Sequence, residues 1–209
     1  MVYAFIVHSL QTGSSKLLFY KTWGPESDSE NSEAVEELSN AGQKICQQRK
    51  AQLITVMKEV QSEFAFRKSV SVNLDQTAEW QALNVEGKLP EFEVGFFRVS
   101  PEFEEYQDLF TCDKVVLWMG ALNTGFTLIL WPDENRIAAE SMLKQLIKHF
   151  HEHCRILTQP SDASHKPEKM LLVTNTYLPY GKIIIANHRL LRQMEKELEA
   201  KIKSAESKS

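Results

Sequence analysis

Two apolar segments, separated by six residues, constrain the fold more than any other feature of this sequence. Residues 114–119 and 126–131 are apolar at nearly every position, so neither run alternates between apolar and polar side chains. Strands of this kind are buried on both faces of a sheet. The residues between them, Gly120-Ala121-Leu122-Asn123-Thr124-Gly125, have the composition of a turn. We therefore expect a hairpin of central strands, with helices covering the sheet on both faces.

Hydrophobic periodicity predicts further strands and helices around this hairpin. Short runs of β-branched and aromatic residues are typical of strands, whereas apolar residues three or four apart are typical of helices. The order is β-β-α-β-β-β-α-α with a C-terminal helix, which favours an α+β fold or a mixed sheet with helices on its faces. The expected strands are 2–8, 16–23, 94–99, 114–119 and 126–131; the expected helices begin at Gln43 and at Pro132-Asp133, span 168–178, and run from an N-cap at Asn187 to about Lys203, after an extended piece at 182–186.

The 209 residues are expected to form one domain over 1–203 with two irregular insertions. The first insertion, 24–42, contains six acidic residues and no Lys or Arg, and it has too little apolar surface to hold a fold. The second, 67–93, follows no clear period, although some of its apolar residues suggest contact with the body. Residues 204–209 are expected to be a disordered tail.

Charge and cysteine content narrow the function classes. The net charge is −4, but without the first insertion the chain carries 24 basic against 22 acidic residues, or +2. So small an excess cannot neutralise many phosphates, so a nucleic-acid partner is not expected. The acidic insertion itself can attract a basic partner or accept phosphate at Ser27 or Ser29, although such runs are more often only soluble. Three widely spaced cysteines without a C-x-x-C pair are typical of reduced thiols in a cytosolic protein.

The apolar segments do not predict a membrane anchor. Residues 2–7 lack the positive segment of a signal peptide. The run 115–131 contains Asn123 and two glycines and is just shorter than the roughly 18 residues of a membrane helix. We expect a cytoplasmic chain that meets membranes only through a partner.

One pattern is similar to a phosphate-binding loop. Gly120-x-x-x-x-Gly125 follows a strand, but Phe126 and Thr127 stand where the loop requires Lys and then Ser or Thr. A second strand rather than a helix follows, so no helix N-terminus is expected to receive an anion. A hairpin turn is the favoured interpretation, and no cofactor is expected.

A second pattern is similar to a metal site. In the helix after Pro132, His149 and His153 share one flank, Cys154 points into the apolar face and His151 points away from it. The protease pattern H-E-x-x-H fails after His151-Glu152, and two His ligands without a third favour a surface helix over a zinc site. We therefore expect no catalytic, cofactor-binding or metal-binding residues and no enzymatic activity.

Four stretches of the chain resemble the small, or sigma, subunits of heterotetrameric adaptor-protein complexes. The later stretches resemble in particular the sigma subunit of the fifth complex. This resemblance implies a longin-like fold, with a five-stranded, mainly antiparallel sheet and helices on both faces. The stretches are 1–8 with Gly13 and 16–20; 49–56; 95–99 with 115–122 and 125–130; and 177–182 with 194–198.

The resemblance also implies a role. A sigma subunit of this kind assembles with zeta, beta and mu subunits, and the complex works with spatacsin and spastizin in cargo retrieval and sorting at late endosomes and lysosomes. Sigma subunits of the better-known complexes help bind acidic dileucine signals through an apolar pocket and nearby basic residues. Lys16 has a position similar to one of these basic residues. The residues that line the pocket in those subunits have no clear counterparts in this chain across 67–93. Lys16 is therefore the candidate cargo-binding residue.

Two alternatives from other classes remain open. The same order of elements is found in longin-domain regulators of small GTPases or of membrane fusion. The second alternative is a metal-dependent enzyme that uses His149 and His153.

Overall fold

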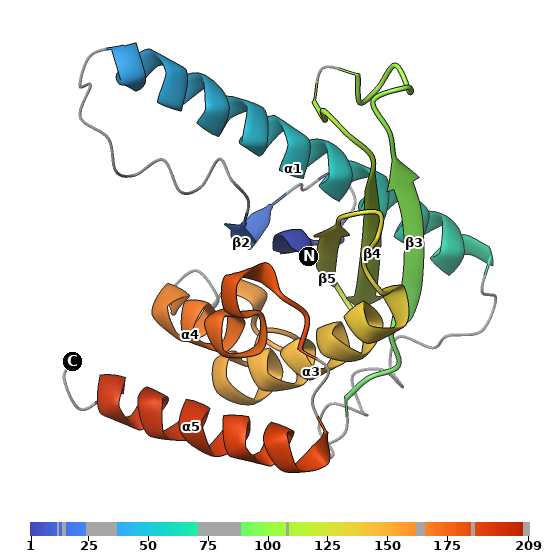
Figure 1. The fold of residues 1–209 in the computed structure, drawn as a ribbon. Helices are drawn as coiled ribbons and strands as arrows, with labels where there is room; N and C mark the ends of the chain where they lie inside the picture. The colour runs from blue at the N-terminus through green and yellow to red at the C-terminus, as the bar shows by residue number, and fades with distance from the viewer. Residues whose placement is uncertain are drawn as a thin grey trace.

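The computed structural model describes residues 1–11, 13, 16–23, 37–70, 89–107, 109–161, 166–184 and 187–206. The expected order of strands and helices is confirmed (Figure 1). The elements are β1 (Val2–Ser9), β2 (Leu17–Thr22), α1 (Glu37–Val70), β3 (Glu93–Val99), β4 (Lys114–Ala121), β5 (Thr124–Leu130), α3 (Arg136–Cys154), α4 (Pro167–Tyr177), the short 3₁₀ helix η2 (Pro179–Gly181) and α5 (His188–Glu206).

The five strands form one antiparallel sheet in the order β2-β1-β5-β4-β3, so β2 and β3 are its edges. The predicted central hairpin is β4–β5, and its strands reach further than the apolar runs indicated, because Gly120 pairs with Gly125. Leu122 and Asn123 make the turn, with Leu122 at a φ of 54°. Gly120 and Gly125 thus belong to a β-hairpin. This agrees with the prediction that the Gly120-x-x-x-x-Gly125 pattern is a hairpin turn.

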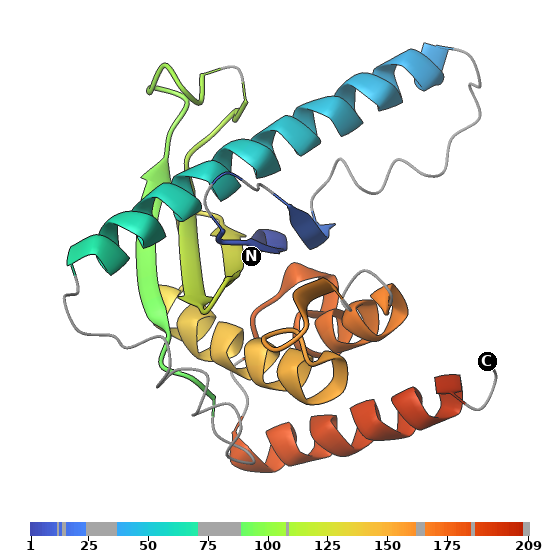
Figure 2. The ribbon, with the colours of Figure 1, turned by 180° about the vertical axis from the view of Figure 1, so that it is seen from behind.

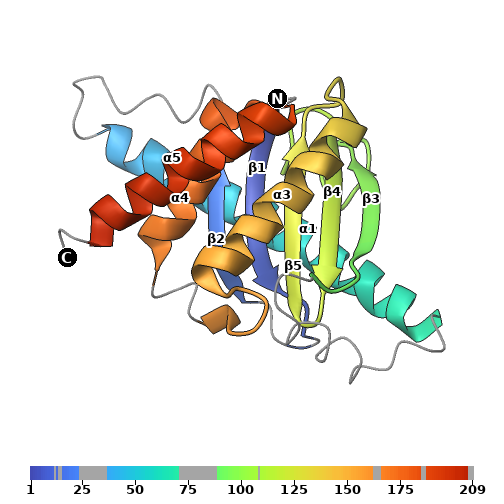
Figure 3. The same cartoon turned by 90° about the horizontal axis from the view of Figure 1, so that it is seen from below.

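Helices cover both faces of the sheet, as Figures 1 and 2 show from opposite sides. Along β1, Ala4 and Ile6 pack toward α1, whereas Phe5 and Val7 pack toward α3 and α4. This division follows from the two-residue period of a strand. On the second face α3 crosses the strands and α5 lies outermost, beyond α4 (Figure 3). The sheet is therefore the middle layer of a three-layer α+β domain.

Helix α1 is longer at both ends than its periodicity indicated. Its buried apolar side chains, Leu53, Val56, Met57, Val60 and Phe64, occupy the part that crosses the sheet. A hydrophobic pattern marks only the turns that pack on a core, whereas solvated turns continue the helix without one. The helix occupies 37–42 and 67–70, so the predicted bounds of both insertions, 24–42 and 67–93, are corrected, and β3 begins at Glu93. Residues 24–36 and 71–88 lie outside the described residues.

Capping side chains mark the starts of α3 and α5. Helix α3 begins at Arg136 rather than at Pro132-Asp133, because Asn135 Oδ1 accepts the Ala138 N–H at 3.1 Å. The predicted N-cap of α5 is confirmed, since Asn187 Oδ1 accepts the Leu190 N–H at 2.9 Å.

The C-terminal predictions are corrected in part. Helix α5 continues to Glu206, so the expectation of a disordered tail is wrong for 204–206, while 207–209 lie outside the described residues. Of the expected extended piece 182–186, Lys182 has extended backbone angles, no strand is assigned over 182–184, and 185–186 are not among the described residues.

Candidate functional site

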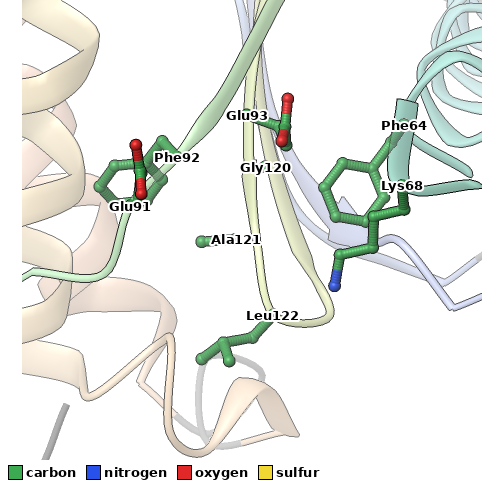
Figure 4. A pocket seen from close by; sticks show the side chains of 8 residues that line it. All are labelled: Phe64, Lys68, Glu91, Phe92, Glu93, Gly120, Ala121 and Leu122. Atoms are coloured by element: carbon green, nitrogen blue, oxygen red, sulfur yellow. The ribbon is translucent and has the colours of Figure 1, made fainter. Parts of the chain in front are cut away.

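A pocket of about 380 Å³ opens at one end of the sheet, between α1, the segment before β3 and the β4–β5 turn. Figure 4 shows Phe92 on one side of it, Phe64 and Lys68 of α1 on the other, and Leu122 below and between them at the β4–β5 turn. Its lining residues are Phe64, Lys68, Glu91, Phe92, Glu93, Gly120, Ala121 and Leu122. Apolar walls with charges of both signs suit an apolar side chain of a peptide, flanked by polar groups.

Glycine at position 120 makes this pocket possible. A Cβ there would lie 2.8 Å from Leu10 Cδ1 and 2.9 Å from Phe64 Cδ2. Phe64 can therefore lie directly against β4 only because position 120 has no side chain. The close packing of α1 on the hairpin thus fixes one wall of the pocket.

Lys16, the candidate cargo-binding residue, lies at the same end of the sheet but does not line this pocket. It precedes β2, its side chain is exposed, and its carbonyl accepts the Ser9 N–H at 2.9 Å. Leu10, the residue that follows β1, donates its N–H to the Asn123 carbonyl in the β4–β5 turn at 2.8 Å. A role for Lys16 in cargo binding stays a prediction.

The histidines of α3 form a second cluster. The rings of His149 and His153 stack with centroids 6.1 Å apart, and Cys154 is buried, as the helical spacing predicted. The prediction of a surface position is wrong for His149, whose side chain is only 2% exposed. The reason is that α4 and α5 pack over this flank and bring Tyr177 and Glu195 to it.

Polar groups engage both ring nitrogens of His149. Nε2 lies 2.7 Å from Tyr177 Oη, and Nδ1 lies 3.0 Å from Glu152 Oε2. Burial lowers the pKa of His149, and Lys148 adds to this effect, while the carboxylates of Glu152 and Glu195 oppose it. Burial, reinforced by the same two carboxylates, raises the pKa of Tyr177. A neutral imidazole therefore faces a neutral phenol at pH 7.

The sequence did not identify three members of this cluster, Glu152, Tyr177 and Glu195. Glu152 lies three residues after His149, so the spacing H-x-x-E-H offered a signal that the search for H-E-x-x-H missed. Tyr177 and Glu195 are on other helices, and only the tertiary structure brings them to the site. His149, Glu152 and His153 each offer one ligand atom, and these atoms all lie within 4.8 Å of one another.

The three cysteines differ in accessibility. Cys46 on α1 is exposed, Cys112 is partly buried, and Cys154 at the end of α3 is buried. Burial raises the pKa of the Cys154 thiol, although Lys169 and Lys166 oppose the change.

Within the described residues, no helix combines the length and the apolar character that crossing a bilayer requires. The strand order β2-β1-β5-β4-β3, with α1 on one face and α3, α4 and α5 on the other, is that of a longin-like domain, the fold class of adaptor sigma subunits. The expected fold class is confirmed.

Comparison with known proteins narrows this class. The model of a family described as AP-5 complex subunit sigma-1 matches residues 1–199. The human AP-5 complex subunit sigma-1 is 25% identical over 206 residues, covering 96% of this chain and 98% of the human protein. The mouse AP-5 complex subunit sigma-1 is 28% identical over 166 residues, covering 76% of this chain and 91% of the mouse protein. The chain belongs to the AP-5 complex subunit sigma-1 family, and membership of an adaptor-subunit family implies a structural role.

Proposed function

We propose that this chain is the small subunit of a heterotetrameric adaptor complex of the AP-5 type and that it acts by assembly rather than catalysis. The family match over residues 1–199 carries the proposal, together with the coverage of 98% of the human relative. Its partners are a zeta, a beta and a mu subunit, and spatacsin and spastizin join through the complex. Residues 1–203 act as one domain in this assembly.

The site of action follows from these partners. The complex brings the chain to the membranes of late endosomes and lysosomes, where it serves cargo retrieval and sorting. In this proposal the chain stays on the cytoplasmic side and contacts the membrane only through its partners.

An exposed apolar surface supports assembly at one edge of the sheet. Ile137 is 76% exposed and Phe96 is 52% exposed. The Arg136 guanidinium lies 3.9 Å from the centroid of the Phe96 ring. We name these three residues the edge patch. Edge strands such as β3 and exposed apolar side chains are features that partner subunits cover, and Phe and Arg are enriched in interfaces. A large adaptor subunit is the proposed occupant.

The test is co-purification. The chain with a C-terminal tag, captured from cells that express the zeta, beta and mu subunits, is expected to bring down all three in stoichiometric amounts. Recovery of the chain alone from such cells would contradict the proposal. The alternative of a small-GTPase regulator makes a different prediction, since the purified chain would then accelerate nucleotide exchange on its GTPase without any adaptor subunit.

Cargo contact at the sheet end is a separate part of the proposal. Lys16 and the pocket share that end, so an acidic peptide with two leucines can place its carboxylates near Lys16 and a leucine in the pocket. Lys16→Ala is expected to lower the affinity of the chain for such a peptide without affecting co-purification of the subunits. Equal binding to wild type and Lys16→Ala would remove Lys16 from the site.

A further inference from the structure

We propose that His149, Glu152 and His153 form a zinc-binding site on α3, which we name the α3 site. Residues three and four apart lie on one face of a helix, one turn from each other. The structure agrees with this spacing, because the three ligand atoms lie within 4.8 Å of one another. All three ligands belong to one helix, so they form a site without any partner.

The donor atoms suit zinc. Two imidazole nitrogens and a carboxylate are a common protein donor set for Zn²⁺, with water in the fourth position. Tetrahedral bonds of about 2.0–2.2 Å place neighbouring donors roughly 3.3 Å apart. Nδ1 of His149 and Oε2 of Glu152 are 3.0 Å apart, close to that spacing. Glu152 is 45% exposed and His153 is partly exposed, so both can rotate by the small amount that closure requires.

Tyr177 positions the buried ligand. Its hydroxyl lies 2.7 Å from His149 Nε2, on the opposite side of the ring from Glu152. When Nε2–H donates to this oxygen, the lone pair of His149 is on Nδ1, facing Glu152. A hydrogen bond to the second nitrogen is the usual way in which proteins orient a metal-ligating histidine.

Charges around the α3 site are compatible with a cation. Glu195 Oε1 lies 3.7 Å from His149 Nε2 and adds a second carboxylate to that of Glu152. Lys148 Nζ lies 3.2 Å from Glu195 Oε1 and 3.8 Å from Glu152 Oε1. Lys148 can therefore keep its partner Glu195 when Glu152 turns to the metal.

A metal-free network is the competing explanation. In the other tautomer of His149, Nδ1–H donates to Glu152 and Nε2 accepts from the Tyr177 hydroxyl. That arrangement satisfies the same atoms without zinc. The two states differ in the nitrogen that carries the proton, which long-range ¹H–¹⁵N spectra of the imidazole report.

The experiment is a titration of the full, chelator-treated chain with Zn²⁺, followed by calorimetry and by thermal unfolding. We expect one Zn²⁺ per chain and a higher Tm. Glu152→Gln and His153→Gln, which alter partly exposed side chains, are expected to weaken binding at least tenfold. His151→Gln is the matched control on the same helix and should bind like wild type. Tyr177→Phe should weaken binding by about tenfold, as losses of outer-shell partners do.

The proposal also predicts that zinc moves the His149 proton to Nε2. Three results would each overturn the proposal. The wild-type chain could fail to bind zinc stoichiometrically, or Glu152→Gln and His153→Gln could bind zinc as tightly as wild type. His151→Gln could also lose as much affinity as those two variants, and scattered histidines would then explain any zinc uptake. A proton that stays on Nδ1 at saturating zinc would do the same.

Discussion

The hydroxyl of Tyr177 lies 2.7 Å from Nε2 of His149, and the two rings stack with centroids 4.5 Å apart. This contact joins α4 to α3 inside the helical layer. A buried polar atom that loses its partner costs about 1–3 kcal/mol. Tyr177→Phe keeps the ring but removes the hydroxyl, so we expect a loss of about 1–3 kcal/mol in the free energy of unfolding, measured with urea and a chelator present.

Tyr180→Phe is the control for this change. Tyr180 is three residues away and 84% exposed, so losing its hydroxyl is expected to alter stability by less than about 0.5 kcal/mol. Equal effects of the two substitutions would show that the bond to His149 contributes nothing to stability.

A second histidine, His8, should make stability depend on pH. It is fully buried in β1, where Nδ1 lies 3.1 Å from the Ser9 carbonyl and Nε2 lies 3.1 Å from Thr127 Oγ1. Burial lowers the pKa of His8 to about 4, from 6.5 in the unfolded chain, although the bond to Ser9 opposes the change. The unfolded state then binds more protons between these values, so stability is full above pH 6.5 and falls as the pH drops toward 4.

This difference corresponds to about 3 kcal/mol for complete protonation. His149, whose pKa is also lowered, acts in the same direction. Chemical denaturation at pH 7, 6 and 5 is expected to give a steeper loss of stability for wild type than for His8→Gln. Parallel pH profiles would mean that His8 does not titrate in this range.

Gly95 is required by the ring of Trp118. The two residues pair across β3 and β4, and a Cβ at position 95 would lie 2.4 Å from Cε2 of that ring. The ring cannot easily move, because its Nε1 donates to Glu63 at 2.5 Å and Arg67 lies over its face. We expect Gly95→Ala to lower the free energy of unfolding by about 1–3 kcal/mol, as overpacking does.

A double-mutant cycle identifies the cause. Trp118→Phe has a smaller ring, so Gly95→Ala should cost at least about 1 kcal/mol less in that background. Additive losses would indicate that backbone effects, and not the Trp118 ring, make glycine necessary.

The edge patch predicts a variant that separates assembly from folding. Ile137→Asp places a charge where the side chain is 76% exposed, so the isolated chain should unfold with unchanged stability, within about 0.5 kcal/mol. Co-purified large subunit is expected to fall at least tenfold, because a buried charge without a partner is costly in an interface. Tyr180→Asp, an exposed residue outside the patch, is the control, and undiminished capture by Ile137→Asp would move the interface elsewhere.

The sequence predicted the parts of the fold whose apolar residues are continuous or strictly periodic. The apolar runs 114–119 and 126–131 indicated central strands, and the spacing from Leu53 to Phe64 indicated a helix on the sheet. The ends of α1 were missed because residues 37–42 and 67–70 carry no apolar period in the sequence. The burial of His149 was missed because it depends on Tyr177 and Glu195, which lie 28 and 46 positions further along the chain.

Because the three thiols differ in burial, their rates of chemical labelling report on local opening of the structure. An exposed thiol such as Cys46 reacts with an alkylating reagent at once, whereas Cys154 reacts only when the end of α3 separates from its neighbours. The labelling rate of Cys154 therefore measures how often this end opens. Because the reagent needs no substitution in the chain, the same rate can be followed before and after zinc or a partner subunit is added, and a ligand that holds the helical layer closed will slow it.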